Sequence, residues 1–353
     1  MDFIADAKNI RRKRLSVVFS LIKQYLCLST NIRMAIHLGS GKNSKLPYFL
    51  RNGLRMATPK SWLRGCLPRV LAEVEMRPDR EYILSRVAYY NKLSGVERLP
   101  AHASLLGDFR LKGNKSAYFF DSFEYTRWFS PSLCWAYVFG DVTQVPEWPA
   151  VLKSRPVAGD NANSVLLNLD KVRHFTFLND AIPFREKSDR AIFRGDIQKK
   201  PHRIRFMERY TGHPMVDTGI IGPLGECPPE WARKKITLWD HLHYKFILAI
   251  EGNDVASNLK WIMSSNSLAV MPRPTYETWF MEGTLIPGVH YVEIEKDYSD
   301  LIEKMEYYLS RPEEAEAIVR NGSEYIRQFR DKRRERLISL LVLEKYFRMT
   351  GQL

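Results

Sequence analysis

The second half of the chain alternates short apolar runs with stretches in which apolar residues recur every three or four positions. The runs predict strands at 191–193, 215–216, 246–250, 268–271 and 290–294, and the stretches predict helices at 201–210, 238–243, 256–263, 300–310, 312–321 and 324–349. Strands that alternate with helices are typical of a parallel sheet covered by helices on both faces. The pattern therefore predicts an α/β fold for this half.

The first half of the chain is less regular. Residues 6–26 and two stretches within 62–93 have a helical period, whereas Gly, Ser, Asn and Pro interrupt residues 42–60 and predict a loop. Short apolar runs predict strands at 118–120, 133–139, 165–169 and 175–177. The polar segment 179–189 marks a domain boundary, which we place after residue 180.

Length and charge narrow the possible partners. At 353 residues the chain exceeds the usual single-domain range, so two domains are expected. Its 54 Lys and Arg against 40 Asp and Glu give a formal net charge of +14, which favours nucleic acid, phospholipid headgroups or phosphorylated substrates. The four cysteines lack C-x-x-C spacing, so neither a zinc site nor a disulfide framework is indicated, and a reducing cytoplasm is the expected compartment.

The N-terminal segment is similar to a signal peptide, because the basic residues 11–14 precede the apolar residues 15–22. Lys23 ends the apolar run well short of the roughly 20 residues that span a bilayer. We expect a basic amphipathic helix here, which either packs into the core or rests on an anionic membrane surface.

A first candidate anion site follows the predicted strand 191–193. Arg194 and Gly195 end this strand, and Lys199 precedes the next helix, whose unpaired backbone N–H groups and dipole would face the turn. The turn matches neither the Rossmann fingerprint nor the P-loop. A solvated basic helix after an ordinary turn is the alternative interpretation.

A second candidate lies where the strand 246–250 ends in Glu251 and Gly252. Ligands of open α/β sheets bind beyond the carboxyl ends of the strands, so Glu251 could accept hydrogen bonds from ribose hydroxyls. Ser257, Asn258 and Lys260 on the following helix could hold phosphate. A capped helix with a surface lysine is the alternative.

Asp141 is a candidate general base, because a carboxylate at the tip of a buried strand can face a cleft half desolvated. A turn aspartate is the alternative. Gln144 and Trp148 follow it, while Trp279 and His290 lie near a later strand, where a lone histidine is more often structural. The chain contains no G-x-S-x-G, H-E-x-x-H or D-x-D sequence, which argues against the usual hydrolase, metalloprotease and metal-bridged diphosphate sites.

In this order the segments resemble glycosyltransferase family 90, which includes bacterial lipopolysaccharide A proteins, fungal capsule-associated proteins and animal protein O-glucosyltransferases. The matching segments are Gly140-Asp141, Gln144 to Trp148, Phe193-Arg194-Gly195, Asp240 to Lys245, Glu251-Gly252 to Ser257, Leu259-Lys260, Glu277-x-Trp279, and Pro287 with His290-Tyr291-Val292. The string 86–93 and the lack of paired cysteines are similar to the bacterial branch.

The resemblance implies a GT-B fold, in which two Rossmann-like domains face a central cleft and a C-terminal helix crosses back to the first domain. Residues 1–180 would bind the acceptor, residues 181–330 would bind a nucleotide-sugar donor, and residues 331–353 would form the returning helix. The implied activity is inverting, metal-independent transfer of a hexose, glucose or galactose, from a UDP-sugar to a lipopolysaccharide or lipooligosaccharide core acceptor. No cofactor is implied.

In that reaction Asp141 would act as the base. The donor would contact Arg194, Gly195, Lys199, Lys245, Glu251, Gly252, Ser257, Asn258 and Lys260. The acceptor or the cleft would involve Gln144, Trp148, Trp279 and His290, and no metal ligand is expected.

The expected partners are the UDP-sugar, the glycan acceptor and an anionic membrane surface, with peripheral attachment at the cytoplasmic face of the inner membrane. Nucleic acid is not expected, because aromatic residues do not interleave with the basic runs. A basic nucleic-acid-binding protein and a catalytically inactive glycosyltransferase-like scaffold are the alternative functions.

Overall fold

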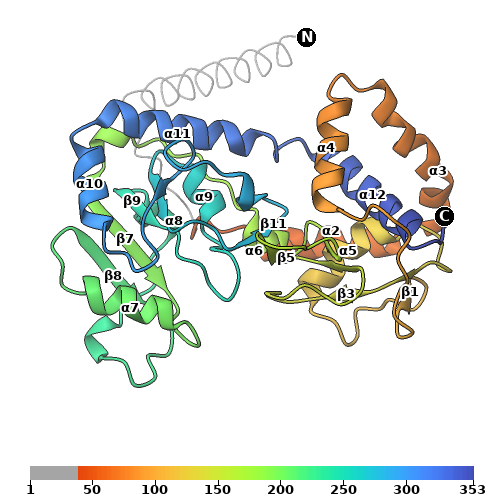
Figure 1. The fold of residues 1–353 in the computed structure, drawn as a ribbon, viewed down its shortest axis with the longest axis horizontal. Coiled ribbons are helices and arrows are strands. Elements are labelled where there is room, and N and C mark those ends of the chain that lie inside the picture. Colours follow the sequence, from red (N-terminus) through yellow and green to blue (C-terminus); the bar gives the residue numbers. More distant parts are fainter. Residues whose placement is uncertain (1–38) are drawn as a thin grey trace, which may run out of the picture. The chain divides into compact units, whose positions relative to one another are not determined.

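The computed structural model describes residues 39–353, so the helix predicted at 6–26, with its signal-like segment, lies outside the described residues. Four helices begin the described chain (Figure 1). They are α2 (Lys45–Ala57), α3 (Lys60–Ala72), the 3-10 helix η1 (Glu73–Met76) and α4 (Arg80–Tyr90). Within residues 39–353 no helix is both long enough and apolar enough to span a bilayer.

A five-stranded sheet with the order β12-β10-β9-β7-β8 organises the second half, and every neighbouring pair is parallel. Its strands are β7 (Ser188–Gly195), β8 (Val216–Ile220), β9 (Tyr244–Leu248), β10 (Leu268–Met271) and β12 (Val292–Glu293). The α/β class and the parallel sheet predicted from the sequence are confirmed. The helix predicted at 201–210 is α7 (Pro201–Tyr210), and β10 also has its predicted bounds.

Apolar side chains cover both faces of this sheet. Ile247 belongs to one hydrophobic cluster, whereas its neighbours Phe246 and Leu248 belong to another, as the alternation along a strand requires. Helix α9 (Leu259–Met263) contributes to the first cluster, and α7 and α10 (Leu301–Leu309) contribute to the second. Helices therefore pack on both faces, which leaves the ends of the strands as the places for a site.

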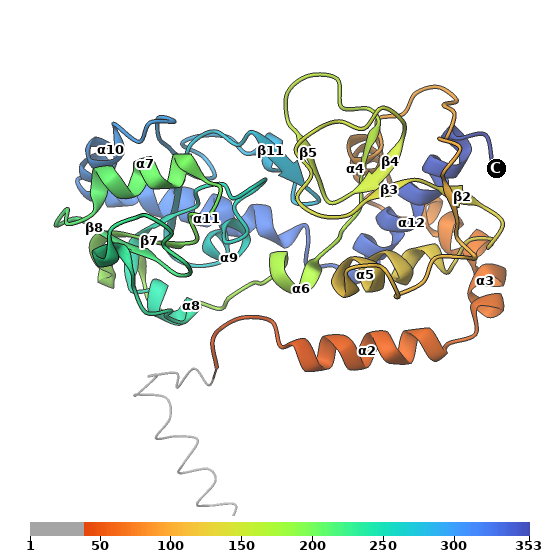
Figure 2. The ribbon, with the colours of Figure 1, turned by 90° about the horizontal axis from the view of Figure 1, so that it is seen from below.

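A second parallel sheet, with the order β3-β4-β6, lies in the first half. Its strands are β3 (Tyr137–Val138), β4 (Ala150–Leu152) and β6 (Ser164–Leu166), while β1 (Ser104–Leu105) and β2 (Cys134–Trp135) form a separate antiparallel pair. A further antiparallel pair, β5 (Ser154–Pro156) with β11 (Tyr276–Thr278), connects the segment after β4 to the segment after β10 (Figure 2).

Two buried ion pairs hold distant parts of the chain together. Arg155 on β5 contacts Glu277 on β11 over 2.8 Å, and both side chains are almost fully buried. Arg86 on α4 pairs with Glu335 on α12 (Lys332–Met349), a helix that packs against α3, α4 and α5 (Ser116–Thr126). A cation and a carboxylate removed from water in this way need each other, because either one alone would be buried uncompensated.

The remaining elements connect these units. They are α5 (Ser116–Thr126), α6 (Lys171–His174), η2 (Phe184–Glu186), η3 (Pro229–Trp231), α8 (Leu238–His241), η4 (Glu282–Thr284), α11 (Pro312–Arg327) and α12 (Lys332–Met349). The break between the last two helices falls at residues 328–331, so its predicted position at 322–323 is wrong.

Three further local predictions are wrong. Residues 42–60 contain α2, although Gly, Ser, Asn and Pro interrupt this stretch of the sequence. Residues 118–120 belong to α5 rather than a strand, and the rings of Phe119 and Phe123, four residues apart, stack 5.4 Å from each other as helical spacing allows. Residues 175–177 form no strand.

Candidate active site

The segments that follow β3 and β9 meet through polar side chains. Asp141, just after β3, accepts a hydrogen bond at Oδ2 from Nδ2 of Asn253 over 2.9 Å. Asn253 lies in the turn between β9 and α9. Both segments leave the carboxyl ends of parallel strands, where ligands bind in open α/β sheets. The structure therefore brings Asp141 to the turn that begins with Glu251 and Gly252.

Lys153, directly after β4, joins the same cluster. Its Nζ lies 2.6 Å from Oδ1 of Asp141 and 2.7 Å from Oδ2 of Asp254, and its side chain is 1% exposed. Burial by itself lowers the pKa of Lys153, but Asp254, Tyr118 and Asp141 outweigh it, so the pKa is raised and the ammonium stays charged. The sequence prediction missed Lys153, although a lysine adjoining the buried run 150–152 is an available signal.

Asp141 remains partly accessible, with 23% of its side chain exposed. Burial raises the pKa of this carboxyl, whereas the hydrogen bonds from Lys153 and Asn253 lower it, and the balance leaves the pKa below its ordinary value. Asp141 is therefore ionised at neutral pH and able to accept a proton.

The Arg203 guanidinium lies between the carboxyl ends of β7 and β9. Its Nη1 donates to the Asp196 carbonyl over 2.8 Å, Nη2 to the Ile250 carbonyl over 2.7 Å, and Nε to the Glu251 carbonyl over 2.8 Å. No carboxylate of residues 39–353 forms an ion pair with it. Burial lowers its pKa to about 10, so the guanidinium still carries an unneutralised positive charge at neutral pH. An anionic ligand would be stabilised here.

Two glycines bring the backbone close to this guanidinium. A methyl group on Gly195 would lie 2.7 Å from Cζ of Phe193 and 3.2 Å from Nη1 of Arg203. A methyl group on Gly252 would lie 3.7 Å from Nη2 of the same arginine. The predicted donor residues Gly195 and Gly252 therefore both border Arg203, which was not among the predicted donor-binding residues.

Arg194 is occupied within the sheet. Its Nη2 lies 2.7 Å from Oδ1 of Asp217 on β8, and its Nη1 donates to the Phe193 and Asp217 carbonyls. The other oxygen of Asp217 accepts a hydrogen bond from Tyr244. The Arg194 side chain is thus committed to a neighbouring strand rather than directed to the turn beyond β7.

The three predicted donor lysines are not brought together. Lys199 is exposed in the left-handed conformation, with φ of 57°, just before α7. Lys245 lies near the N-terminal end of β9, whereas Gly252 follows the C-terminal end of that strand. The Lys245 ammonium pairs with Asp189. Lys260 is 0% exposed and pairs with Glu282 inside the core. Of the three, the structure leaves only Lys199 open to a ligand.

The other residues of the second turn have mixed roles. Both carboxylate oxygens of Glu251 accept hydrogen bonds from Thr275, and burial raises the pKa of Glu251. Asn258 is the N-cap residue before α9 and donates to the Leu248 carbonyl over 2.9 Å. The Ser257 hydroxyl makes no hydrogen bond to another residue in the part of the chain that the structure describes, so it remains open to a ligand.

Gln144 and Trp148 lie on the segment that Asp141 begins. Gln144 is exposed, and Trp148 is half-buried with its ring edge-on to His102, 5.0 Å between centroids. These two predicted acceptor residues therefore lie close to Asp141 along the chain and remain reachable.

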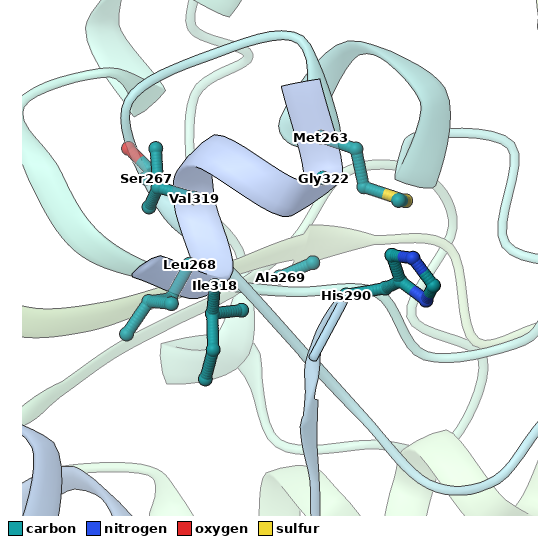
Figure 3. A pocket seen from close by; sticks show the side chains of 8 residues that line it. All are labelled: Met263, Ser267, Leu268, Ala269, His290, Ile318, Val319 and Gly322. Carbon is teal, nitrogen blue, oxygen red and sulfur yellow. The ribbon is translucent and has the colours of Figure 1, made fainter. Parts of the chain in front are cut away.

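Trp279 and His290 are placed elsewhere. Trp279 is 1% exposed, stacks on Tyr90 at 3.8 Å and donates from Nε1 to Glu335, so its role is packing. His290 borders a hollow of about 180 Å³ beside Met263 and Gly322 (Figure 3). Side chains fill the hollow so closely that it has no room even for a water-sized sphere, and it is too small for a sugar nucleotide.

The cluster around Asp141 thus combines an ionised carboxylate and a buried ammonium, and an unneutralised guanidinium, Arg203, contacts the Ile250 and Glu251 carbonyls just before Asn253. It can accept a proton at Asp141 and hold an anion near Arg203. Residues 39–353 contain no group of three or more His, Cys, Asp or Glu side chains arranged to hold a metal ion.

Comparison with known proteins identifies the family of this chain. The sequence model of glycosyl transferase family 90 matches residues 164–339. O-glucosyltransferase LpsA of Dichelobacter nodosus is 41% identical over 305 residues, which cover 86% of this chain and 95% of LpsA. Protein O-glucosyltransferase 3 of Homo sapiens is 30% identical over 165 residues, 45% of this chain and 32% of the human protein. The chain therefore belongs to glycosyltransferase family 90, and to the transferases.

Proposed function

We propose that this chain transfers a hexose, glucose or galactose, from a UDP-sugar to a lipopolysaccharide or lipooligosaccharide core acceptor, with inversion and without a metal ion or cofactor. The observation that carries the proposal is the contact between Asp141 and the turn after β9, because it sets a proton acceptor beside a candidate donor site. The likeness to an O-glucosyltransferase over most of the chain supports sugar transfer and favours glucose.

In the proposed step, an acceptor hydroxyl attacks the anomeric carbon of the donor. The new bond joins this oxygen to the carbon, the bond from the carbon to the diphosphate oxygen breaks, and the hydroxyl proton passes to Asp141. Lys153 and Asn253 hold the Asp141 carboxylate in its ionised form and fix both of its oxygens. One displacement on the face opposite the leaving group inverts the anomeric centre.

The leaving diphosphate gains negative charge in this step. Arg203, the backbone at Gly195 and Gly252, and the open hydroxyl of Ser257 are the groups we propose to stabilise it. Lys199, exposed before α7, adds a second cation that a ligand could reach. Arg203 replaces Arg194 as the main guanidinium, because Arg194 is held by Asp217.

For the architecture we propose the GT-B arrangement, with acceptor binding by residues 1–180 and donor binding by residues 181–330. The packing of α12 against α3, α4 and α5 supports a C-terminal helix that returns to the first part of the chain. The two parallel sheets, whose strand ends meet at Asp141 and Asn253, support a site between the two parts.

A donor panel tests the proposal. Thermal stability is measured with UDP, UDP-glucose and UDP-galactose, and transfer to lipooligosaccharide is measured with and without EDTA. A donor that binds the folded chain raises its stability by linkage, and we expect chelator-resistant transfer of one hexose. Failure of every uridine nucleotide to stabilise the protein would contradict the donor assignment, and loss of activity in EDTA would contradict metal independence.

Asn253→Ala is expected to move the acid limb of the pH–rate profile to higher pH. The pKa of Asp141 is lowered in part by this asparagine, so removing its hydrogen bond raises the pKa. A carboxylate needed in its ionised form loses activity as the pH falls through its pKa, so the loss now begins at higher pH. Profiles of kcat check this, with the exposed Asn321→Ala as control; coincident acid limbs would contradict it.

We also propose that the protein works in the cytoplasm at the inner face of the inner membrane, attached peripherally through its basic surface. The formal charge of +14 supports attraction to an anionic leaflet. Such attachment is screened by salt, so the fraction that sediments with membranes is expected to fall as ionic strength rises. Attachment that resists high salt would contradict a peripheral, charge-driven mode.

A further inference from the structure

Helix α2 buries its polar side. The Tyr48 hydroxyl donates to Asp121 over 3.0 Å, Asn52 is 1% exposed and donates to the Tyr48 carbonyl, and Arg55 pairs with Glu124. These contacts attach α2 to α5, along which it lies (Figure 2). The face that a helix of a water-soluble domain normally exposes is therefore turned inward.

The opposite side of α2 carries a stripe of leucines. Leu46 is 68% exposed, Leu50 61% and Leu54 74%, and their spacing of four residues sets them in one row. Large apolar side chains that line up and face water mark a surface with a partner. We call this row the leucine stripe.

The chain around the stripe is uniformly basic. Residues 41–72 contain no Asp or Glu, and their cations are Lys42, Lys45, Arg51, Arg55, Lys60, Arg64 and Arg69. Lys45 and Arg51 are exposed on α2 itself. The charge therefore favours an anionic partner over a second copy of this chain, which would bring the same cations to the contact.

A basic pocket adjoins the end of α2. Lys60, Arg64 and Arg127 line it with Leu106 and Phe129. None of these three cations forms an ion pair with a carboxylate of residues 39–353. Arg127 also leaves its buried Nε without a partner in that range.

The basic pocket adjoins the last turn of α2, and its cations repel one another without a carboxylate of the described residues to neutralise them. Nη1 of Arg127 donates to the Arg55 carbonyl over 2.6 Å, which links the pocket to the last turn of the helix. Burial, together with Arg110, Arg64 and Arg127, lowers the pKa of Lys60. A bound phosphate group would relieve the repulsion among these cations.

We propose that α2 and this pocket dock the protein on an anionic phospholipid bilayer. The leucine stripe inserts at the boundary of headgroups and acyl chains, the exposed cations approach the anionic surface, and the pocket takes a lipid phosphate. This inference deepens the proposed membrane attachment, on which it rests, by naming the surface. The N-terminal residues 1–38 match this basic face less well than an anionic bilayer does, because they also carry a net positive charge, including the basic run 11–14.

Vesicle sedimentation of the full chain tests the inference, with phosphatidylcholine vesicles that contain or lack phosphatidylglycerol. The variant Leu46→Ser/Leu50→Ser/Leu54→Ser is expected to partition onto the anionic vesicles at least ~30-fold less than the wild type. Val96→Ser/Ile286→Ser, which removes apolar side chains 72% and 53% exposed elsewhere, is the matched control and is expected to bind normally. Unchanged melting temperatures show that both variants fold.

A second experiment tests the basic pocket. Lys60→Gln/Arg64→Gln is expected to weaken binding to the anionic vesicles, and inorganic phosphate at matched ionic strength is expected to compete poorly, because a lipid phosphate is presented together with a surface for the stripe. Release by phosphate alone would overturn the lipid assignment.

The outcomes separate the proposals. A wild type that binds no vesicle, yet turns over UDP-sugar, would remove the membrane attachment and leave the transferase proposal intact. Wild-type binding that the leucine substitutions leave unchanged would overturn the α2 assignment. A wild-type dimer that the same substitutions dissociate would identify the stripe as a self-contact and would also overturn it.

Discussion

An Asp141→Asn variant is expected to transfer sugar about 10²–10⁴-fold more slowly than the wild type at saturating substrate. The amide keeps the shape of the side chain but cannot take the acceptor proton. Folding is expected to survive, because Lys153 keeps Asp254 as a partner 2.7 Å away and no buried ammonium is left unpaired. The measurement is kcat for transfer, beside the affinity for UDP by calorimetry.

Asp160→Asn is the control for this prediction, since it removes the charge of an exposed aspartate that lies before β6. We expect the control to keep wild-type kcat and both variants to keep UDP affinity, because a base acts on the acceptor and not on the nucleotide. Wild-type transfer by Asp141→Asn would end the assignment of the base. If Asp141→Asn lost both UDP binding and sugar transfer, Asp141 would instead belong to the donor pocket.

The fold of the second half could be predicted because its strands are buried on both faces. A strand that is covered on both faces has a continuous apolar sequence, as at 268–271. The helices between these strands have a clear apolar period. The first half lacks this regularity. Its strands β3 and β4 are two and three residues long, and α2 exposes the side that a period would have placed inside.

The candidate site could be predicted in part. Topology alone brings strand ends together, so Asp141 and the turn after β9 were found from their positions after apolar runs. Lys153 joins them, and Asn253 of that turn bonds to Asp141, through contacts between segments far apart in the chain, which no local pattern reports. Lys260 has the same sequence signature as a surface lysine, and only its pairing with buried Glu282 distinguishes it.

The motif Glu277-x-Trp279 shows how a family pattern can mark structure. Glu277 pairs with Arg155 across β5 and β11, and Trp279 stacks on Tyr90 and donates to Glu335. Both side chains are nearly inaccessible. The resemblance to glycosyltransferase family 90 had placed Trp279 in the cleft, because Trp279 belongs to this matching motif. Its location instead ties β11 to α4 and α12.

Arg203→Ala is expected to lower kcat for transfer about 10²–10³-fold, a loss of about 3 kcal/mol of transition-state stabilisation. Arg203 is the cation at the ends of β7 and β9 that no described carboxylate neutralises, so its charge is available to the leaving diphosphate. Charge on the diphosphate grows as the bond to the sugar breaks, so the effect should fall more on kcat than on KM.

Three companion variants make this prediction specific. Arg205→Ala removes an exposed cation from the same helix and is expected to have little effect. Arg203→Lys keeps the charge but cannot reach three carbonyls at once, so it should recover only part of the rate. Arg194→Ala is expected to cost less than Arg203→Ala, since Asp217 already neutralises Arg194. The reverse order for the two arginines would mean that substrate binding releases Arg194 from Asp217 and turns it toward the diphosphate, and the donor site would then centre on β7 rather than on α7.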